Sequence, residues 1–569
     1  MYPIHLRGRS VSVQLVHEDE SVILDMNKVA EGQEYLSIAG MAVSPNNRYL
    51  AWLQDDDGAE RFRLRVRDLQ TGQDMVHEVS GCKWSLTFAA DNQTIFYTRS
   101  DHAQRPHQIW RHNIHTDSAN DQMVHAEPDE RFFLSVRSSR DHQFVFLSAQ
   151  SKTTSELHAI RAQTPAETPQ CIWPRIDGVE CDVSHSGDRF FFRTNQEAEN
   201  FRLLARSSKT MPAHNSSAAL EEVIAHRREV LLENVHAFAR HVVLTEKHNG
   251  LGQYTVLRLE DGHRHTVVFP DETYEISEAA NAEFYTNVFR YTYTSLAHPE
   301  STFAHNMDEN SQQCIKQRPV GGNFQPGRYA VSRTWATAND GAQVPISVIR
   351  LRSTGKTSPN PAYLIGYGSY GYSYPALFSS GWLSLVDRGV TVAIAHIRGG
   401  QEMGRHWYLN GKADKKTNTF TDFIACAEHL IATGLTSPDQ LAINGGSAGG
   451  LLMGAVINMR SDLFRAVVAQ VPFVDVLTTM LDDTLPLTVT EYDEWGNPND
   501  PKVYETILSY SPYDNLKSQN YPSMLVTAGL NDPRVGYWEP AKWVAQIRTL
   551  NTADSVVLLR THMGAGHGG

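Results

Sequence analysis

Apolar and polar positions alternate in short runs through the first 327 residues, and polar turns separate the runs. In residues 62–67 the alternation is complete, which is the pattern of a β-strand with one buried face. Equivalent turn residues, Asn46, Asp91, Asp141 and Asp188, follow one another after 45, 50 and 47 positions. Repeats of this length with β patterning predict a β-propeller over residues 1–327, with seven blades or an incomplete set of them. An array of β-sandwiches is the alternative.

Beyond Pro326-Gly327, short apolar runs are separated by longer segments with helical spacing. Apolar runs without alternation are typical of strands that a parallel sheet buries on both faces. We therefore predict an α/β domain over residues 328–569, of the α/β-hydrolase type argued below. Its strands are expected at 363–365, 390–395, 441–444, 466–469, 524–528 and 556–559, and helices at 420–433 and 538–550. In the first half, the polar stretch 207–219 is expected to be an exposed loop within one unit.

Composition limits the partners. Asp and Glu number 64 against 51 Lys and Arg, so the net charge is −13 at pH 7. Such a surface argues against nucleic-acid and anionic-membrane partners and weakly favours cationic substrates. The five cysteines are scattered without a C-x-x-C pair, which favours a reducing compartment and neither a disulfide framework nor a zinc site. Because the start lacks a secretory leader and the longest apolar run, 390–397, is too short to cross a bilayer, we predict a cytoplasmic protein.

Ser447 lies in the pattern G-x-S-x-G at 445–449, between a predicted strand at 441–444 and a predicted helix at 451–459. A serine at such a turn has strained backbone geometry, and its hydroxyl projects from the end of the sheet. The glycines leave room for the crossing backbone. The pattern predicts a nucleophile, and a plain glycine-rich loop is the alternative.

Acyl transfer by serine needs a general base and a carboxylate that orients the base. The α/β-hydrolase fold supplies these in the chain order nucleophile, acid, histidine. Asp532 fits the acid because it follows the apolar run 524–528. His562 and His567 both follow the last run, 556–559, and His567 lies on a glycine-rich loop that could fold back over Ser447. These residues alone leave both histidines open.

The tetrahedral intermediate of acyl transfer needs donors for its oxyanion. The backbone N–H of Ala448 is one donor, because it follows the nucleophile, and the loop 366–371 is expected to supply a second. The Tyr367 hydroxyl is a candidate. The residues do not distinguish it from the neighbouring tyrosines, which are Tyr363, Tyr370, Tyr372 and Tyr374.

The loop 366–371 also reads G-x-G-x-x-G, the pattern of a dinucleotide site, with Asp387 further along. Pro375 interrupts the helix that such a site requires, and Asp387 precedes the next strand instead of ending it. We therefore expect no nucleotide. Because the sequence has no H-E-x-x-H, Walker or paired-cysteine pattern, we also expect no metal and no organic cofactor.

Several segments carry a resemblance to a known family. They are GGSAGGLLMG at 445–454, VPFVDV at 471–476, EYDEWGNP at 491–498, SYSPYDN at 509–515 and YWEPAKW at 537–543. With these segments the chain resembles the prolyl oligopeptidase family of serine peptidases, and within it the oligopeptidase B group, over nearly its whole length. The resemblance implies a propeller that caps the hydrolase domain, with the active site in a cavity between them that excludes large folded proteins.

The resemblance also assigns roles to residues. It implies the triad Ser447, Asp532 and His567, in preference to His562, and an oxyanion site at Tyr367 and Ala448. It further implies cleavage of short peptides after Arg or Lys, with the basic side chain held by Glu491 and Asp493. From the residues alone, Glu491, Asp493 and Glu494 are interpreted more readily as a solvated acidic surface turn. Asp493 stands where the family commonly has Glu, so its reach is shorter.

Three points are left open by the comparison with the family. Arg534 is either an anchor for the peptide backbone or part of a structural ion pair. Pro375 and Leu377 stand where some relatives have acids, so a preference for paired basic residues is left open. The chain also starts within the first propeller blade and stops two residues after His567, so we expect a shortened chain. The alternatives to a peptidase acting after basic residues are therefore an aminopeptidase or esterase on the same scaffold, or an inactive propeller interaction module.

Overall fold

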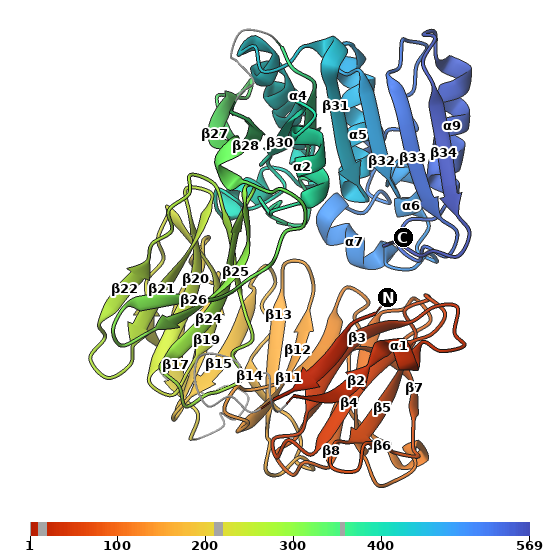
Figure 1. Cartoon of the computed structure of the whole chain (residues 1–569). Helices are drawn as coiled ribbons and strands as arrows, with labels where there is room; N and C mark the ends of the chain where they lie inside the picture. Colours follow the sequence, from red (N-terminus) through yellow and green to blue (C-terminus); the bar gives the residue numbers. More distant parts are fainter. Residues whose placement is uncertain (1, 9–19, 210–219, 353–358, 569) are drawn as a thin grey trace.

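The computed structural model describes residues 2–8, 20–209, 220–352 and 359–568 and consists of two domains stacked on one another (Figure 1). The first contains antiparallel sheets, and the second contains one eight-stranded sheet covered by helices. The last strand of the first domain, β26 (Ser311–Gln317), is separated from β27 (Tyr329–Thr337) of the second by a short connection. Residues 210–219, most of the expected loop at 207–219, lie outside the described residues.

The first domain is a β-propeller, as predicted, and not an array of β-sandwiches. Within the described residues, six four-stranded units follow one another along the chain, and β1 with β2 forms a further two-stranded sheet. The units β3–β6 and β7–β10 join through β5 and β7 into one eight-stranded sheet, while β11–β14, β15–β18, β19–β22 and β23–β26 are separate sheets.

The bounds of the propeller elements are β1 (Ile4–Arg7), β2 (Ser21–Asp25), α1 (Met26–Val29), β3 (Ser37–Val43), β4 (Tyr49–Asp55), β5 (Phe62–Asp68), β6 (Gln73–Asp74), β7 (Val79–Phe88), β8 (Thr94–Ser100), β9 (Pro106–Asn113), β10 (Gln122–Ala126), β11 (Phe133–Ser138), β12 (Phe144–Gln150), β13 (Ser155–Arg161), β14 (Gln170–Trp173), β15 (Cys181–Ser186), β16 (Arg189–Thr194), β17 (Arg202–Ser207), β18 (Glu221–Ile224), β19 (Val230–Ala237), β20 (His241–His248), β21 (Leu251–Arg258), β22 (Arg264–Val267), β23 (Glu275–Glu278), β24 (Val288–Ser295) and β25 (His298–Asn306).

The alternation seen in the sequence decides how these sheets pack. Along β5, buried residues alternate with half-buried ones, whereas β4, an inner strand of the same unit, is buried throughout. Neighbouring units meet through aromatic rings. The ring centres of Phe144 in β12 and Phe190 in β16 lie 4.9 Å apart, and the angle between the ring planes is 63°. This edge-to-face contact is favourable beyond the area that it buries. Each unit thus buries its apolar faces against the units beside it.

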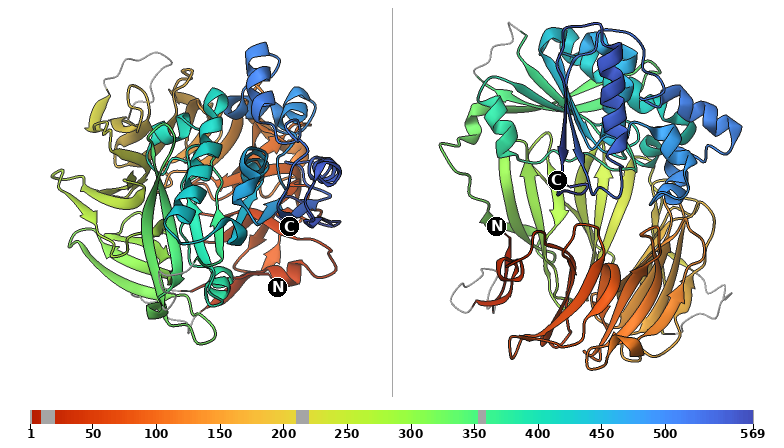
Figure 2. Two further views of the ribbon diagram at one scale, coloured as in Figure 1. Left: turned by 90° about the horizontal axis from the view of Figure 1, so that it is seen from above. Right: turned by 90° about the vertical axis from the view of Figure 1, so that its right-hand side faces the viewer.

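The second domain has the strand order β27-β28-β30-β29-β31-β32-β33-β34, in which the six strands from β30 to β34 run parallel. The carboxyl ends of parallel strands meet at one edge of a sheet, and here that edge faces the propeller (Figure 1). Figure 2 shows the hydrolase sheet and its helices lying over the propeller. Phe423, Ile443 and Val456 lie fully buried in the core between sheet and helices.

The bounds of the remaining elements are β28 (Gln343–Leu351), β29 (Ala362–Ile365), α2 (Ser380–Val386), β30 (Thr391–Ala395), α3 (Arg405–Leu409), α4 (Thr417–Ala432), β31 (Leu441–Gly446), α5 (Ala448–Arg460), β32 (Ala466–Gln470), α6 (Val476–Leu481), α7 (Thr488–Trp495), α8 (Pro501–Tyr510), β33 (Ser523–Gly529), α9 (Trp538–Leu550) and β34 (Val557–His562).

Two further observations concern membranes and disulfides. Among the helices of the described residues, none is long and apolar enough to span a bilayer. All five cysteine thiols are free, in agreement with the absence of a disulfide framework expected from their spacing.

Candidate active site

Ser447 occupies the turn between β31 and α5, with φ 55° and ψ −119°. A serine rarely adopts this left-handed conformation, so the surroundings must hold it there. The Ser447 N–H donates to the Gln470 carbonyl at 2.8 Å, and the Ser447 carbonyl accepts from the Gly450 and Phe473 N–H groups. A side chain at Gly445 would collide with the Gly449 backbone, which explains why the turn needs glycine.

Asp532 and His567 meet beside this turn. His567 Nδ1 lies 2.7 Å from Asp532 Oδ2, and the Asp532 carboxylate is fully buried. Its other oxygen accepts from the backbone N–H groups of Arg534 and Val535 at 2.8 and 3.0 Å. His562 instead ends β34, where its carbonyl accepts from Leu530 N–H. Of the two histidines that the sequence left open, the structure brings His567 to Asp532.

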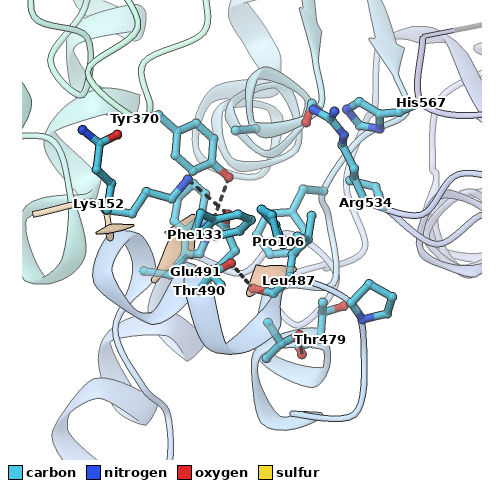
Figure 3. A pocket seen from close by; sticks show the side chains of 18 of the residues that line it. Pro106, Phe133, Lys152, Tyr370, Thr479, Leu487, Thr490, Glu491, Arg534 and His567 are labelled. Carbon is cyan, nitrogen blue, oxygen red and sulfur yellow. Dashed lines mark hydrogen bonds and ion pairs between the residues drawn. The ribbon is translucent and has the colours of Figure 1, made fainter. Parts of the chain in front are cut away.

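Ser447 and His567 line one cavity of about 890 Å³ between the domains, called the interdomain cavity below. Both domains contribute to its wall. The hydrolase domain supplies Tyr367, Tyr370, Ala448, Glu491 and Arg534, and the propeller supplies Pro106, Phe133, Gln150 and Lys152. Figure 3 shows Lys152, Tyr370 and Glu491 grouped at one side of the cavity and Arg534 with His567 at the other.

The structure separates the tyrosines that the sequence could not. Of the five near the loop 366–371, all within the described residues, only Tyr367 and Tyr370 line the interdomain cavity. The Tyr370 hydroxyl donates to Glu491 at 2.8 Å and is therefore engaged elsewhere. Burial, followed by the charges of Glu491 and Glu494, raises the pKa of Tyr367, so its hydroxyl remains a proton donor. Tyr367 is therefore the tyrosine that we keep as the candidate for the second oxyanion donor.

Lys416 fixes this loop, and sequence reasoning missed it. Its buried ammonium donates to the Gly368 carbonyl at 2.5 Å and to the Ser369 hydroxyl at 2.8 Å. Burial lowers the pKa of Lys416 to about 8. In the sequence this residue is one more lysine before a predicted helix, so nothing there indicated its burial.

Glu491 stands on the first turns of α7 with three neighbours around its carboxylate. Oε2 accepts from the Tyr370 hydroxyl at 2.8 Å and from Trp495 Nε1 at 3.0 Å. Oε1 lies 3.5 Å from the Lys152 ammonium of the propeller. Glu491 thus lines the interdomain cavity among polar partners and is not part of a solvated surface turn.

Two other predicted binding residues lie differently. Asp493 is not among the residues that line the interdomain cavity, and its carboxylate accepts from the Thr153 hydroxyl at 3.3 Å. Arg534 lines the cavity, and its guanidinium lies 3.1 Å from Glu60 of the propeller. Arg534 therefore forms an ion pair, which is one of its two predicted roles. Its position on the cavity wall is also compatible with the other role, an anchor for the peptide backbone.

One group of side chains could hold a metal ion within the part of the chain that the structure describes. It comprises His125, Glu156 and His158 of the propeller, whose ligand atoms lie within 4.8 Å of one another. Arg175 already lies 3.4 Å from the Glu156 carboxylate. None of these residues lines the interdomain cavity, so the group is separate from the chemistry at Ser447.

Fold and site together define a serine hydrolase whose α/β-hydrolase domain is capped by a β-propeller. Residues 1–318 match the N-terminal β-propeller domain of prolyl oligopeptidase, and residues 377–569 match the prolyl oligopeptidase family. The chain belongs to the prolyl oligopeptidase family and is a serine peptidase.

Individual relatives are similar over the full chain. Protease 2 of Moraxella lacunata is 39% identical over 571 residues, covering 100% of this chain and 82% of that protein. Dipeptidyl aminopeptidase BI of Pseudoxanthomonas mexicana is 39% identical over 586 residues, covering 100% and 80%. The closed form of oligopeptidase B from Trypanosoma brucei, with covalently bound antipain, has a TM-score of 0.94 at 36% identity and covers 100% and 81%. The resemblance to oligopeptidase B is confirmed.

Proposed function

We propose that this serine peptidase hydrolyses short peptides after Arg or Lys through an acyl-enzyme on Ser447. The observation that carries the proposal is Glu491, a carboxylate in the same cavity as Ser447 and His567, with a cationic side chain already beside it. A desolvated guanidinium or ammonium group requires such a carboxylate partner.

In the proposed reaction, His567 Nε2 removes the proton of the Ser447 hydroxyl as Oγ attacks the scissile carbonyl carbon. Asp532 keeps the imidazole in the tautomer with its proton on Nδ1 and stabilises the imidazolium that forms. The oxyanion receives hydrogen bonds from the Ala448 N–H and the Tyr367 hydroxyl. His567 then protonates the leaving amine as the C–N bond breaks, and a water molecule hydrolyses the acyl-enzyme by the same steps in reverse order.

The size of the site favours short substrates. Ser447 lies in a cavity of about 890 Å³ with propeller residues on its wall, so a folded protein cannot present an internal bond to it without rearrangement. Cytoplasmic location, and the absence of nucleic-acid and membrane partners, stay predictions from the sequence.

Fluorogenic peptides that differ only before the scissile bond test this proposal. We expect efficient cleavage after Arg and Lys, poor cleavage after Pro and Ala, and no cleavage by Ser447→Ala. A serine-directed phosphonate should label the wild type at one site and leave the variant unlabelled. Good turnover of a short acyl ester without cleavage after Arg would contradict the basic specificity and favour an esterase. An unlabelled wild-type chain would favour a propeller module without activity.

A second candidate is removal of dipeptides from free N-termini. The observation that favours it is the relative named dipeptidyl aminopeptidase BI, which is as similar to this chain as Protease 2. Peptides with free and acetylated N-termini separate the two. An aminopeptidase loses activity on acetylation, whereas an oligopeptidase that recognises Arg or Lys cleaves both forms.

A further inference from the structure

The propeller turn at residues 151–154, between β12 and β13, contacts both acids that the family resemblance implies for substrate binding, Glu491 and Asp493. Lys152 lies against Glu491, and the Thr153 hydroxyl donates to Asp493 at 3.3 Å. The turn itself is anchored in the propeller: Ser151 N–H donates to the Thr154 carbonyl at 2.9 Å, and the Thr154 hydroxyl accepts from Gly178 N–H. Two consecutive propeller side chains, Lys152 and Thr153, therefore contact carboxylates on α7.

The surroundings of the Lys152 ammonium match those that a basic substrate side chain needs. Nζ lies 3.5 Å from Glu491 Oε1 and 4.6 Å from the centre of the Tyr370 ring (Figure 3). A carboxylate and an aromatic face together attract a cation. Since Tyr370 and Trp495 both donate to Oε2, Oε1 is the oxygen that faces Lys152. A substrate cation would need the same oxygen.

We propose that Lys152 is an internal competitor for the substrate's basic side chain, which must displace its ammonium from Glu491. The inference rests on the proposed function, because it takes Glu491 as the partner of the substrate cation. Displacement also removes a contact between the 151–154 turn and α7, so binding in the pocket is coupled to loosening of the domain interface. Lys152 is thus a specificity-determining residue that touches neither the scissile bond nor the oxyanion.

The energetics allow the exchange. The Lys152 side chain is 33% exposed and that of Glu491 18%, and partly exposed ion pairs contribute little to stability. Lysine has a flexible stem and a compact charge that water can receive when it leaves. A substrate guanidinium is more weakly hydrated than an ammonium and presents several N–H donors to Oε1, so it can replace the ammonium.

Lys152→Met tests the inference because it keeps the apolar stem and removes the charge. We expect KM for a peptide cleaved after Arg to fall by roughly twofold to fivefold, the value of a partly exposed ion pair, with kcat unchanged. A peptide with Ala at that position does not reach Glu491, and its KM should not change. Lys152→Arg should keep the competition and leave KM at or above the wild-type value.

Lys209→Met is the matched control, since Lys209 is also a propeller lysine paired to an acid, Asp188, at 2.8 Å, and it does not line the interdomain cavity. Its KM should equal that of the wild type, and thermal melting checks that both variants fold. An unchanged or raised KM in Lys152→Met, in an enzyme that cleaves after Arg, overturns the inference alone. A wild type that does not cleave after basic residues overturns the proposed function instead.

Discussion

At one side of the interdomain cavity, Ser447 and His567 line the wall, and Asp532 lies beside His567. Backbone geometry holds Ser447, and buried hydrogen bonds within the hydrolase domain hold Asp532. At the other side, Glu491 faces a partly exposed lysine that belongs to the propeller. Arg534, near His567, likewise reaches across to Glu60. Groups inside one domain are positioned once, by folding, whereas groups that meet across the domains can separate without unfolding either one.

The two sides of the cavity suit two different tasks, precise chemistry and the exchange of substrates. Acyl transfer requires a nucleophile, base and oxyanion donors that do not reorganise during the reaction. Under the proposal for Lys152, recognition of a basic side chain also needs a carboxylate that can release one cation and accept another. The ion pairs across the domains suit the second task because solvent screens them and each contributes little.

The largest expected effect is at the nucleophile. Ser447→Ala should lower kcat by roughly 10⁶-fold, and Asp532→Asn by roughly 10⁴-fold, because the first removes the attacking atom and the second disturbs the tautomer of His567. Steady-state hydrolysis of an Arg peptide measures both. Ser509→Ala, at an exposed position on α8, is the control and should retain full activity. Residual activity above one per cent of wild type in Ser447→Ala would show that another residue attacks.

The next effect compares the two tyrosines of the cavity. Tyr367→Phe should lower kcat by about 10²- to 10³-fold with little change in KM, the usual cost of one oxyanion donor. Tyr370→Phe should leave kcat nearly unchanged and raise KM for Arg peptides, because Glu491 loses a hydrogen bond that holds its carboxylate in place. If the two variants exchange these effects, the oxyanion assignment is wrong.

A smaller effect concerns Lys416 and pH. Its pKa is about 8 in the folded chain against an ordinary value of 10.5, so between these values the unfolded state binds more protons. The buried charge destabilises the folded chain fully below pH 8, and this penalty is lost as pH rises from 8 to 10.5. The melting temperature of the wild type, minus that of Lys416→Met, should therefore increase with pH over this window. A difference that does not vary with pH would mean that Lys416 titrates in the folded chain as it does in the unfolded chain, so that burial does not lower its pKa.

The smallest effect is expected at Arg534. Because its side chain is 48% exposed and paired with Glu60, Arg534→Gln should lower kcat/KM by less than about fivefold, as for other exposed ion pairs. The same peptides measure it. A loss of a hundredfold would instead mean that Arg534 anchors the substrate backbone, the other role that the sequence allows.

The sequence predicted the parts of the molecule that depend on local pattern. Each strand and helix predicted in the second domain corresponds to an observed element, and the predicted and observed bounds differ by at most three residues. The order Ser447, Asp532, His567 followed from strand ends, because parallel strands bring their carboxyl ends together. Residues that act through packing between domains carried no such pattern. The contact of Lys152 with Glu491 depends on how a propeller turn meets α7. The hydrogen bond of Tyr370 to Glu491, which Tyr367 does not share, depends on the path of one loop.

The central claim is that Glu491 gives this peptidase its preference for a basic side chain. Its most direct test is the ratio of kcat/KM for two peptides that differ only in having Arg or its uncharged analogue citrulline before the scissile bond. We predict a ratio above roughly 10 for the wild type, since a hydrogen bond to a charged group contributes about 1.5–3 kcal/mol, and a ratio near one for Glu491→Gln. Asp493 lies against Thr153, so Asp493→Asn should lower the ratio less than Glu491→Gln does. An equal ratio in the wild type and in Glu491→Gln would contradict the account.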